Sequence, residues 1–383
     1  MKISLKKKVM LALLAGGMLC SNNALAANTV TVNGVTKTLD LANYGLMTLI
    51  MGAPLNNSTI AFSLDSDFIT KVGDNPDLDV VFLVGSMGST GDNSGNTIRL
   101  NAGNFYVEGC SVSSEGIIGM GGLSQSNFKA NSNNYIVNGG KFVEKTQDGR
   151  FKFYGAKANE GEASHNVLSF TNSTFVSMGD IWGAFSDSGD ASDNQVTFTS
   201  CSKDTLQFQS PKDPSIMEEK YYNVNVYGGQ GKNANGNIVT VKNAEISSIK
   251  AGYATDGDAK DNKIEIFSGN VGDVIAGYVR VDNNVAAIAD AYISGNSIVI
   301  HGGNINGNNI NASNFVDSNG INAHICNNNV LIENMTATQY INIRGGYIEY
   351  GGANNIIGGG FAYAQVENSN LTTNGGNIGN ILG

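Results

Sequence analysis

The side chains best suited to chemistry in this sequence are histidines and carboxylates, and the histidines lack the spacing of a known site. His165, His301 and His324 lie outside any H-E-x-x-H or Cys/His metal-binding pattern. No G-x-S-x-G motif is present, so a serine hydrolase has no support. The glycines form Gly-Gly turns rather than phosphate-binding loops. We therefore predict no catalytic residues, no cofactor-binding residues and no cofactor.

Two acidic loops are the strongest candidates for a metal site. They are SDSGDASDN and TDGDAKDN, and their corresponding carboxylates are Asp187, Asp190 and Asp193 in the first loop and Asp256, Asp258 and Asp261 in the second. If the loops stacked on each other, these oxygens would suit calcium. Neither loop has the twelve-residue spacing of an EF-hand, and aspartates are common in solvated turns. We therefore favour turn residues and predict no metal site.

Tyrosines next to Gly-containing turns suggest a second kind of site. Tyr222, Tyr227, Tyr253 and Tyr278 could be exposed and line a sugar-binding face. Alternatively, each tyrosine ring packs against the next copy of the repeat, because a tyrosine side chain is apolar enough to be buried there. The sequence leaves both interpretations open.

The composition limits the fold that positions these residues. The 383 residues include 52 Asn and 49 Gly but only four Pro, and 41% of the chain is hydrophobic. Asn and Gly are poor helix formers, and the hydrophobic share is too high for a disordered chain. Collagen is excluded because Pro is scarce and Gly does not recur at every third position. The composition favours an all-β protein.

A degenerate repeat runs through most of the chain. Each copy reads Asn, any residue, apolar, any residue, apolar, and copies start 25 to 43 residues apart. The clear copies begin at Asn166, Asn194, Asn237, Asn262, Asn296 and Asn329, with an earlier copy at Asn96 and a weaker one at Asn134. A Gly-containing turn and a polar loop of variable length precede several of these starts.

The alternation puts apolar pairs such as Val239 and Val241, or Ile264 and Ile266, on one face of a short strand. A single short strand cannot bury that face alone, whereas stacked repeats bury a continuous row. Asn at matching corners can form hydrogen-bonded ladders and tolerates the left-handed conformation that a sharp corner needs. The pattern therefore predicts a parallel β-helix, with an antiparallel sandwich or barrel as the alternative.

Three regions follow from this pattern. Residues 27–95 should form an N-terminal cap and the first coils, because TVTVNGVTKTLDL reads as a hairpin around Asn33-Gly34. Residues 96–383 should form the repeat region. A departure near residues 201–222 should be an outward loop, since it contains Pro211, Pro214 and the charged run MEEK.

Residues 1–26 have the features of a secretory signal peptide. Four lysines precede an apolar stretch, and Ala24-Leu25-Ala26 forms the cleavage site. Removal of that segment would leave 19 basic and 33 acidic residues, a net charge of −14 that disfavours nucleic acid as a partner. No other apolar run is long enough for a transmembrane segment. Cys110, Cys201 and Cys326 are far apart, so buried thiols are favoured over a disulfide bridge.

At these repeats the chain resembles the passenger regions of autotransporter adhesins from Gram-negative bacteria. Those regions carry V-Y-G-G…G-x-A-x-x-N-x-V-x-I-x-G-G, and the stretches at 226–241, 251–278 and 295–308 match this form. Such proteins end in a membrane β-barrel, whereas this chain ends in GGNIGNILG, so the resemblance is to the passenger alone.

The resemblance implies a right-handed parallel β-helix that is exported through the inner membrane to the cell surface, the outer membrane or the extracellular space. The implied function is adhesion or surface coverage without catalysis. The implied partners are host or bacterial cell surfaces, glycans, or copies of the chain itself. The alternative is a β-helix polysaccharide lyase or hydrolase acting on extracellular glycans, although no carboxylate pair stands out from the turn aspartates.

Overall fold

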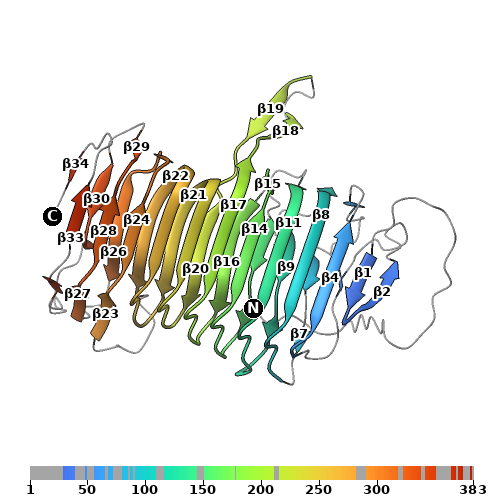
Figure 1. Cartoon of the computed structure of the whole chain (residues 1–383), viewed down its shortest axis with the longest axis horizontal. Helices are drawn as coiled ribbons and strands as arrows, with labels where there is room; N and C mark the ends of the chain where they lie inside the picture. Colours follow the sequence, from blue (N-terminus) through green and yellow to red (C-terminus); the bar gives the residue numbers. More distant parts are fainter. Residues whose placement is uncertain are drawn as a thin grey trace.

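Parallel strands lie side by side along the long axis of the molecule in the computed structural model (Figure 1). The structure describes residues 29–38, 48–49, 56–64, 68–71, 80–84, 87–88, 91–108, 116–144, 151–176, 178–210, 215–281, 290–317, 322–337, 341–350, 364–367, 370–373 and 380–381. None of these residues is helical, so the prediction of an all-β chain is confirmed. It follows that none of them belongs to an apolar helix of membrane-spanning length. The predicted signal peptide, residues 1–26, and Cys110 lie outside the described residues.

Most described strands belong to one large sheet, in which the strands pair in parallel with those one repeat earlier and one repeat later, except for an antiparallel hairpin at the N-terminal end. We call each such repeat a rung. The first column of strands follows the Asn starts: β4 (Thr59–Leu64), β8 (Thr97–Glu108), β11 (Asn134–Glu144), β14 (Val167–Thr171), β17 (Gln195–Lys203), β21 (Ile238–Ala254), β22 (Lys263–Arg280), β24 (Ser297–Ile300), β28 (Asn329–Ile332) and β33 (Asn370–Thr373).

Further columns complete each rung. The second column contains β5 (Phe68–Lys71), β15 (Thr174–Phe175), β25 (Asn304–Ile305) and β29 (Thr336–Ala337). The first three pair with the later parts of the long strands β8, β11 and β22, and β29 pairs with β25. The third holds β3 (Thr48–Leu49), β6 (Val80–Val84), β9 (Gly116–Met120), β12 (Phe151–Tyr154), β16 (Met178–Ser186), β20 (Asn225–Gly231), β26 (Asn309–Asp317), β30 (Asn342–Arg344) and β34 (Asn380–Ile381), together with the later halves of β21 and β22.

Short parallel strands extend this arrangement. Beside the third column lie β7 (Met87–Gly88), β10 (Leu123–Ser124), β13 (Lys157–Ala158) and β31 (Tyr347–Tyr350). A separate parallel sheet contains β23 (Asp290–Ser294), β27 (Asn322–Cys326) and β32 (Ala364–Glu367). Consecutive rungs therefore run in the same direction, which excludes the antiparallel alternative for the described repeats.

The apolar residues of the repeat face inward, as their alternation predicts. Val239, Val241, Ile264 and Ile266 are all fully buried. Aromatic rings fill the same core further toward the N-terminus, where Phe170 and Phe198 stack with ring centroids 5.5 Å apart. Burying a side chain of this size contributes roughly 1.5–3 kcal/mol relative to leaving it exposed, so this shared core is the main source of stability.

A ladder of buried asparagines runs along one corner of the core. Its members have no exposed surface and are Asn96, Asn133, Asn166, Asn194, Asn237, Asn262, Asn296 and Asn328. On each rung from Asn96 to Asn296, the backbone N–H and side-chain Nδ2 both donate to the Oδ1 of the ladder asparagine on the following rung, at 2.8–3.2 Å. Ser58 extends this pattern toward the N-terminus, because its N–H donates to Asn96 Oδ1 at 3.2 Å.

The second Nδ2 hydrogen of a ladder residue also has a partner. On several rungs it donates to the backbone carbonyl three residues before the preceding ladder position, as Asn194 does to Ala163 O at 3.1 Å and Asn237 to Ala191 O at 3.0 Å. The residues at that position, among them Ala163, Ala191, Ala234 and Ala259, are fully buried. The Ala of the G-x-A-x-x-N pattern is therefore buried, and its backbone carbonyl oxygen accepts a hydrogen bond from the ladder asparagine of the next rung.

Two predicted repeat starts were wrong by one residue. The ladder uses Asn133 and Asn328, whereas we expected Asn134 and Asn329, and Asn329 is exposed. Each site contains two consecutive asparagines, and only the first of each pair is followed by apolar residues at both required positions. The correct register is the one that buries Val330 and Ile332, or Tyr135 and Val137, on the core side.

The left-handed corner residue is also not the ladder asparagine itself. It is the residue just before, and its φ lies between 56° and 73° on every rung of the ladder: Gly95, Ser132, His165, Asp193, Gly236, Asp261, Gly295 and Asn327. Only Gly adopts this conformation without steric cost, and Asn and Asp tolerate it better than most residues. The corner therefore explains the mixture of Gly and short polar residues at this position.

In the described part of the chain, antiparallel pairing occurs in two hairpins and between one further pair of strands. The strands β1 (Thr29–Val32) and β2 (Val35–Thr38) form the predicted hairpin around Asn33 and Gly34, which both have positive φ. Strand β1 also pairs with β4 in an antiparallel orientation, on the edge of β4 away from β8. The second hairpin, β18 (Leu206–Gln209) and β19 (Met217–Lys220), occupies the segment expected to project and extends away from the body (Figure 1).

The ladder register gives a matched pair of substitutions. Asn328→Ala should lower the free energy of unfolding by about 1–3 kcal/mol, because it leaves the buried N–H and Nδ2 of Asn296 without their acceptor. Asn329→Ala, at the neighbouring exposed position, should change it by less than about 0.5 kcal/mol. Thermal unfolding followed by circular dichroism measures both. Equal effects of the two variants would contradict the register.

Candidate functional site

Outward-facing side chains form two rows across the third column of strands. The first row, in register from strand to strand, is Met120, Tyr154, Trp182, Tyr227, Lys250 and Ile275. The second row is Leu123, Lys157, Phe185, Gln230, Tyr253 and Tyr278. We call these twelve residues the aromatic face.

The rings of the aromatic face stack along the long axis. Tyr154 and Trp182 are parallel within 2° at 4.5 Å between centroids, and Trp182 and Tyr227 lie at 5.4 Å and 12°. Tyr253 and Tyr278 form a second stack at 4.8 Å and 8°. Because neighbouring rings cover one another's faces, the stacks present mainly ring edges to the outside. Tyr154 and Trp182 are buried, whereas the three later tyrosines are half-buried.

Lysines accompany the rings. The Lys250 ammonium lies 4.5 Å from the centroid of Tyr278, 5.2 Å from that of Tyr253 and 5.7 Å from that of Tyr227. Contacts between an ammonium and the face of an aromatic ring contribute roughly 0.5–2 kcal/mol each. Trp182 Nε1 donates to Gln230 Oε1 at 2.8 Å. Burial, with a smaller effect from the charge of Asp180, holds the pKa of Tyr227 well above its usual value, so its hydroxyl stays protonated.

A bend between the two rows requires glycine. A Cβ on Gly183 would collide with the carbonyl oxygen of Gly228 on the next strand, and one on Gly155 would collide with that of Gly183. The bend lets outward side chains three residues apart converge, so that the rings of Trp182 and Phe185 meet edge to face at 5.8 Å. Backbone packing at these glycines therefore sets the geometry of the aromatic face.

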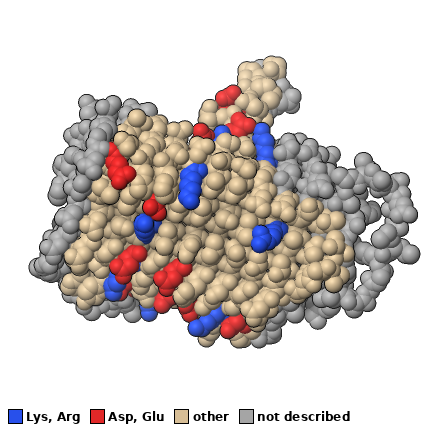
Figure 2. All heavy atoms as spheres, in the orientation of Figure 1, with Lys and Arg blue, Asp and Glu red and all other residues tan. Residues whose placement is uncertain are grey.

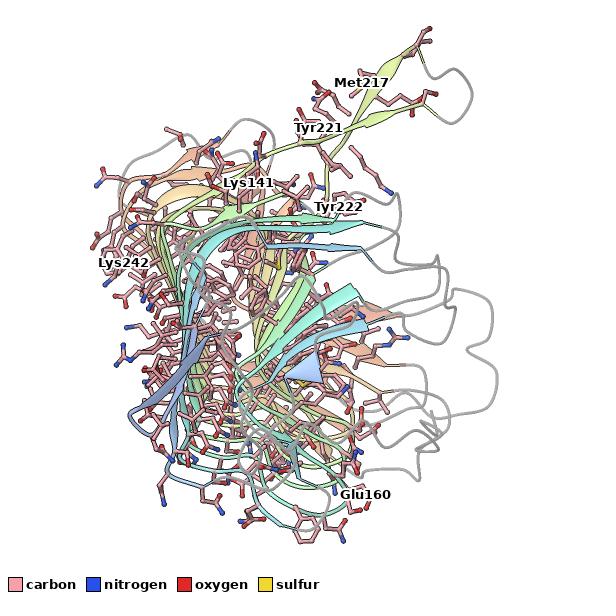
Figure 3. The ribbon with its side chains drawn as sticks, turned by 90° about the vertical axis from the view of Figure 1, so that its right-hand side faces the viewer. Lys141, Glu160, Met217, Tyr221, Tyr222 and Lys242 are labelled. Atoms are coloured by element: carbon pink, nitrogen blue, oxygen red, sulfur yellow. The ribbon has the colours of Figure 1, made fainter. Side chains whose placement is uncertain are left out.

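The projecting hairpin is the second candidate surface. Six large apolar side chains are exposed in the described part of the chain, and three of them belong to this segment: Ile216 (52%), Met217 (56%) and Tyr221 (67%). Figure 3 shows Met217 and Tyr221 away from the body and Tyr222 at the base. Leu206 and Tyr222 pack there with Val143 and Val176, which anchors the hairpin.

The predicted tyrosine site is therefore only partly assembled. Tyr227, Tyr253 and Tyr278 share the aromatic face, but Tyr222 is 2% exposed and belongs to the hairpin base instead. We did not predict that Tyr154, Trp182 and Phe185 would contribute to this face. Their signal was present, since Tyr154 and Trp182 precede a Gly in the same way as Tyr227, whereas Tyr253 and Tyr278 follow one.

The acidic loops do not bring their carboxylates together. Asp193 and Asp261 occupy equivalent corners two rungs apart, with Gly236 on the rung between them. Asp190 Oδ1 accepts from Asn233 Nδ2 at 2.9 Å, and Asp258 is one rung further on. Within the described ranges, no cluster of three or more His, Cys, Asp or Glu side chains could hold a metal ion. The intervening rung 226–236 separates the two loops.

One histidine lies in an ion-pair cluster. His301 Nδ1 is 2.7 Å from Glu333 Oε2, and its Nε2 is 3.3 Å from Glu265 Oε1. The hydrogen bond with Glu333, helped by Glu265 and opposed by burial, raises the pKa of His301 above its usual value. Burial raises the pKa of Glu265, but the hydrogen bond with His301 and the charge of Lys263 outweigh it and lower this pKa overall.

The remaining histidines and thiols have local structural roles. His165 is the left-handed corner residue of its rung and lies 3.6 Å from Asp193 in an exposed pair. The ring of His324 stacks on Tyr292 with centroids 4.5 Å apart. Cys201 is a buried free thiol whose pKa is raised by burial, and Cys326 is a half-buried free thiol.

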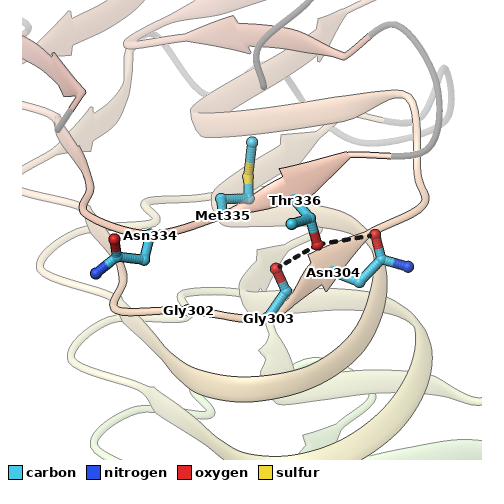
Figure 4. A pocket seen from close by; sticks show the side chains of 6 residues that line it. All are labelled: Gly302, Gly303, Asn304, Asn334, Met335 and Thr336. Carbon is cyan, nitrogen blue, oxygen red and sulfur yellow. Dashed lines mark hydrogen bonds between the residues drawn. The ribbon is translucent and has the colours of Figure 1, made fainter. Parts of the chain in front are cut away.

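The wider surface of the described residues offers little else. In the view of Figure 2, charged side chains are scattered over a largely uncharged face. A hollow of about 550 Å³ is lined by Gly302, Gly303, Asn304, Asn334, Met335 and Thr336 (Figure 4). The Thr336 hydroxyl there already contacts Gly303 O at 3.3 Å and Asn304 Oδ1 at 3.4 Å. The aromatic face and the hairpin are therefore the better candidates.

The glycine bend can be tested with the single tryptophan of the chain. Gly183→Ala should lower the free energy of unfolding by about 1–3 kcal/mol through overpacking against the Gly228 carbonyl. It should also shift the fluorescence emission of Trp182 to longer wavelength, because the stack opens to water. Gly302→Ala is the matched control, since its added Cβ has more room. Unchanged fluorescence and stability in Gly183→Ala would refute the close packing.

The His301 cluster predicts a pH dependence. A raised folded pKa contributes stability below the unfolded pKa of about 6.5, and this contribution disappears as the pH rises through the folded pKa. The melting temperature of the wild type should therefore exceed that of Glu333→Gln by more at pH 5.5 than at pH 8.5. High salt should shrink the difference. A pH-independent difference would exclude the ion pair as its source.

Comparison with known proteins gives no relative from which a function follows. No protein-family model matches the chain, and neither does any curated protein or solved structure. A function must therefore be inferred from the sequence and the geometry of the chain itself.

Proposed function

We propose that this chain is an exported bacterial surface protein, an adhesin-like passenger that mediates adhesion or surface coverage without catalysis. Its strands would wind as a right-handed parallel β-helix. The observation that supports the proposal is the continuous parallel pairing of rungs around the buried asparagine ladder. Its partners would be host or bacterial cell surfaces, and its location the cell surface, the outer membrane or the extracellular space.

A β-helix suits this role because each rung contacts only its neighbours. Stability then increases rung by rung, and the molecule can be long without a globular core. Neighbouring strands are about 4.8 Å apart, so the eight rungs from Asn96 to Asn328 span roughly 34 Å. The signal-peptide features of residues 1–26 supply the route across the inner membrane in this proposal.

The hairpin is the part best placed to recognise another surface. Met217 is 56% exposed and Tyr221 is 67% exposed, and both lie away from the stacked rungs. Exposed apolar side chains on a projecting element are typical of interaction sites. Glu218 and Glu219 are exposed beside them and give the tip an acidic rim.

The experiment compares bacteria that export the full chain with the same strain lacking it. Exposure at the surface is measured by protease accessibility on intact cells, and adhesion by the number of cells retained on host cells or by aggregation of the bacteria. We expect accessibility and at least about fivefold higher retention or aggregation. Protein confined inside the cell, or release of uronic acids from plant or bacterial polysaccharides by the purified chain, would contradict the proposal.

A hairpin variant then tests where recognition occurs. Residues 207–219 are replaced by Asn-Gly, which closes the register pair Leu206 and Lys220 with a tight turn and keeps the anchor Tyr222. The variant should fold with a melting temperature within a few degrees of the wild type, while adhesion falls to the background level. The matched control Val35→Ser changes an exposed apolar residue elsewhere. Full adhesion by the hairpin variant would place recognition outside the hairpin.

A further inference from the structure

Within the described part of the chain, the projecting hairpin is a two-stranded sheet with no neighbouring strand on either edge. Strand β18 pairs only with β19, and β19 only with β18. Ser210 N donates to Ile216 O at 2.9 Å, so in the alternating antiparallel pattern the backbone groups of Gln207 and Gln209 point away from β19. The outer edge of β18 therefore presents peptide N–H and C=O groups that another strand could pair with.

This edge can be reached from solvent. The hairpin extends away from the stacked rungs (Figures 1 and 3). On β18 the side chain of Gln207 is exposed, while Leu206 is buried against Tyr222 at the base of the hairpin. A pair of strands without further neighbours is only marginally stable in water, and a third strand adds stability. The hairpin therefore has room for another strand and would be stabilised by one.

The charges on the edge strands restrict where such pairing can occur. Strand β19 reads MEEK, and β2, the outer strand of the N-terminal hairpin, reads VTKT. Charged side chains, Lys in particular, keep an edge strand from adding another strand. Strand β18 reads LQFQ and has no charge. Among the open edges of the described hairpins, β18 alone lacks this protection.

A second copy of the chain fits the β18 edge. Two copies related by a twofold axis at Phe208 would place Gln207 of each opposite Gln209 of the other, which is an uncharged pair. The same symmetry applied to β19 would set Glu218 against Glu218, or Glu219 against Glu219. Like charges directly opposite each other are destabilising. The hairpin sequence therefore favours self-pairing through β18 and disfavours it through β19.

Antiparallel pairing also determines where the two molecules lie. Strand β18 runs from the base of the hairpin, at Leu206, toward its tip, at Gln209. Two antiparallel copies would therefore have their bases at opposite ends of a four-stranded sheet with the order β19-β18-β18-β19. The stacked rungs of the two molecules would lie beyond those opposite ends, separated by the hairpins. This arrangement suits a contact between chains on two different cells.

The size of the contact indicates a weak association. Four residues of strand span only roughly 14 Å. The formal charge of −10 on each chain adds a repulsion that salt screens. Interfaces of this size belong to the weak and transient class. On a cell surface many copies act together, so even a weak pairing holds two cells in contact.

We propose that the β18 edge pairs in an antiparallel orientation with β18 of a second copy, so that two chains join through a four-stranded sheet formed by their hairpins. This deepens the proposed function, because it names the partner of the hairpin, and it rests on that function only for its biological setting. The pairing itself is a property of the purified chain.

Sedimentation velocity of the full chain, from ~10 to ~300 µM, measures the pairing. The wild type should form dimers in a concentration-dependent manner. Gln207→Pro removes a backbone N–H that points away from β19, and proline is tolerated at such edge positions. The variant should therefore keep its melting temperature, while the dimer dissociation constant rises at least about tenfold, since each dimer loses two hydrogen bonds.

A charge exchange tests the partner and the register. Gln207→Lys/Gln209→Lys sets Lys opposite Lys, so its dimers should be at least about tenfold weaker. Mixing it with Gln207→Glu/Gln209→Glu should restore mixed dimers, because Lys then faces Glu. The matched control Asn138→Lys/Asn329→Lys has the same net charge at two exposed positions on the first column of strands. It should dimerise like the wild type.

Four results would overturn the inference. They are a chain that stays monomeric over the whole concentration range, undiminished pairing of the Lys variant, absence of mixed dimers, and equal weakening by the control. Cells that adhere although the purified chain is monomeric would refute self-pairing and leave the surface function standing, with a strand from a different protein as the partner of the hairpin. Dimers of a chain that never reaches the surface would support the pairing and refute the surface function.

Discussion

The structure depends on the requirement that a buried amide side chain must have all its hydrogen bonds satisfied. A ladder asparagine has two side-chain donors and one acceptor oxygen, and the only partners inside the corner are the rungs above and below. Asn194 illustrates this, because its Nδ2 contacts Asn237 Oδ1 and Ala163 O, while its own Oδ1 accepts from Asn166. One residue per rung is thereby held in register with its neighbours, and the apolar pair that follows is directed into the core.

Outside the core, a different constraint shapes the candidate site. At the bend between the two rows, Gly155 and Gly183 allow backbones of successive strands to approach too closely for any Cβ. The aromatic rings then stack with the same period as the strands, so stability and surface chemistry depend on the same spacing. Where the stack ends at Tyr278, that regularity stops, and Asn311 and Asn314 of β26 are left with polar atoms that nothing in the described chain satisfies.

Much of the fold follows from the sequence, because the ladder asparagine and its two apolar followers recur with little variation. The inward faces of β21 and β22 were predicted from the alternation alone. The register failed only at the pairs Asn133-Asn134 and Asn328-Asn329, where burial of the neighbouring apolar residues, rather than the asparagine, decides. The sequence did contain this information, because starts at Asn134 and Asn329 place Asn138 and Glu333 where the pattern requires an apolar residue.

The candidate site was less predictable for a physical reason. Tyr222 and Tyr227 look alike in sequence, yet one is buried at the hairpin base and the other lies on the aromatic face. The acidic loops also looked equivalent, and only the rung between them, with Asn233 and Gly236, keeps their carboxylates apart. Such outcomes depend on the surface toward which the side chains point after a bend in the backbone. That direction is decided by backbone contacts between rungs.

The direction of the ladder has a consequence for how such a molecule changes during evolution. Each asparagine donates toward the C-terminal neighbour and accepts from the N-terminal one, so every junction between repeats is chemically the same. The intervals along the chain nevertheless range from 25 residues to 43 residues without breaking the series. Duplication or deletion of one whole repeat, from one ladder asparagine to the next, would leave the same hydrogen bonds between neighbouring rungs. Gene recombination can therefore change the number of repeats, while selection maintains the asparagine hydrogen bonds between them.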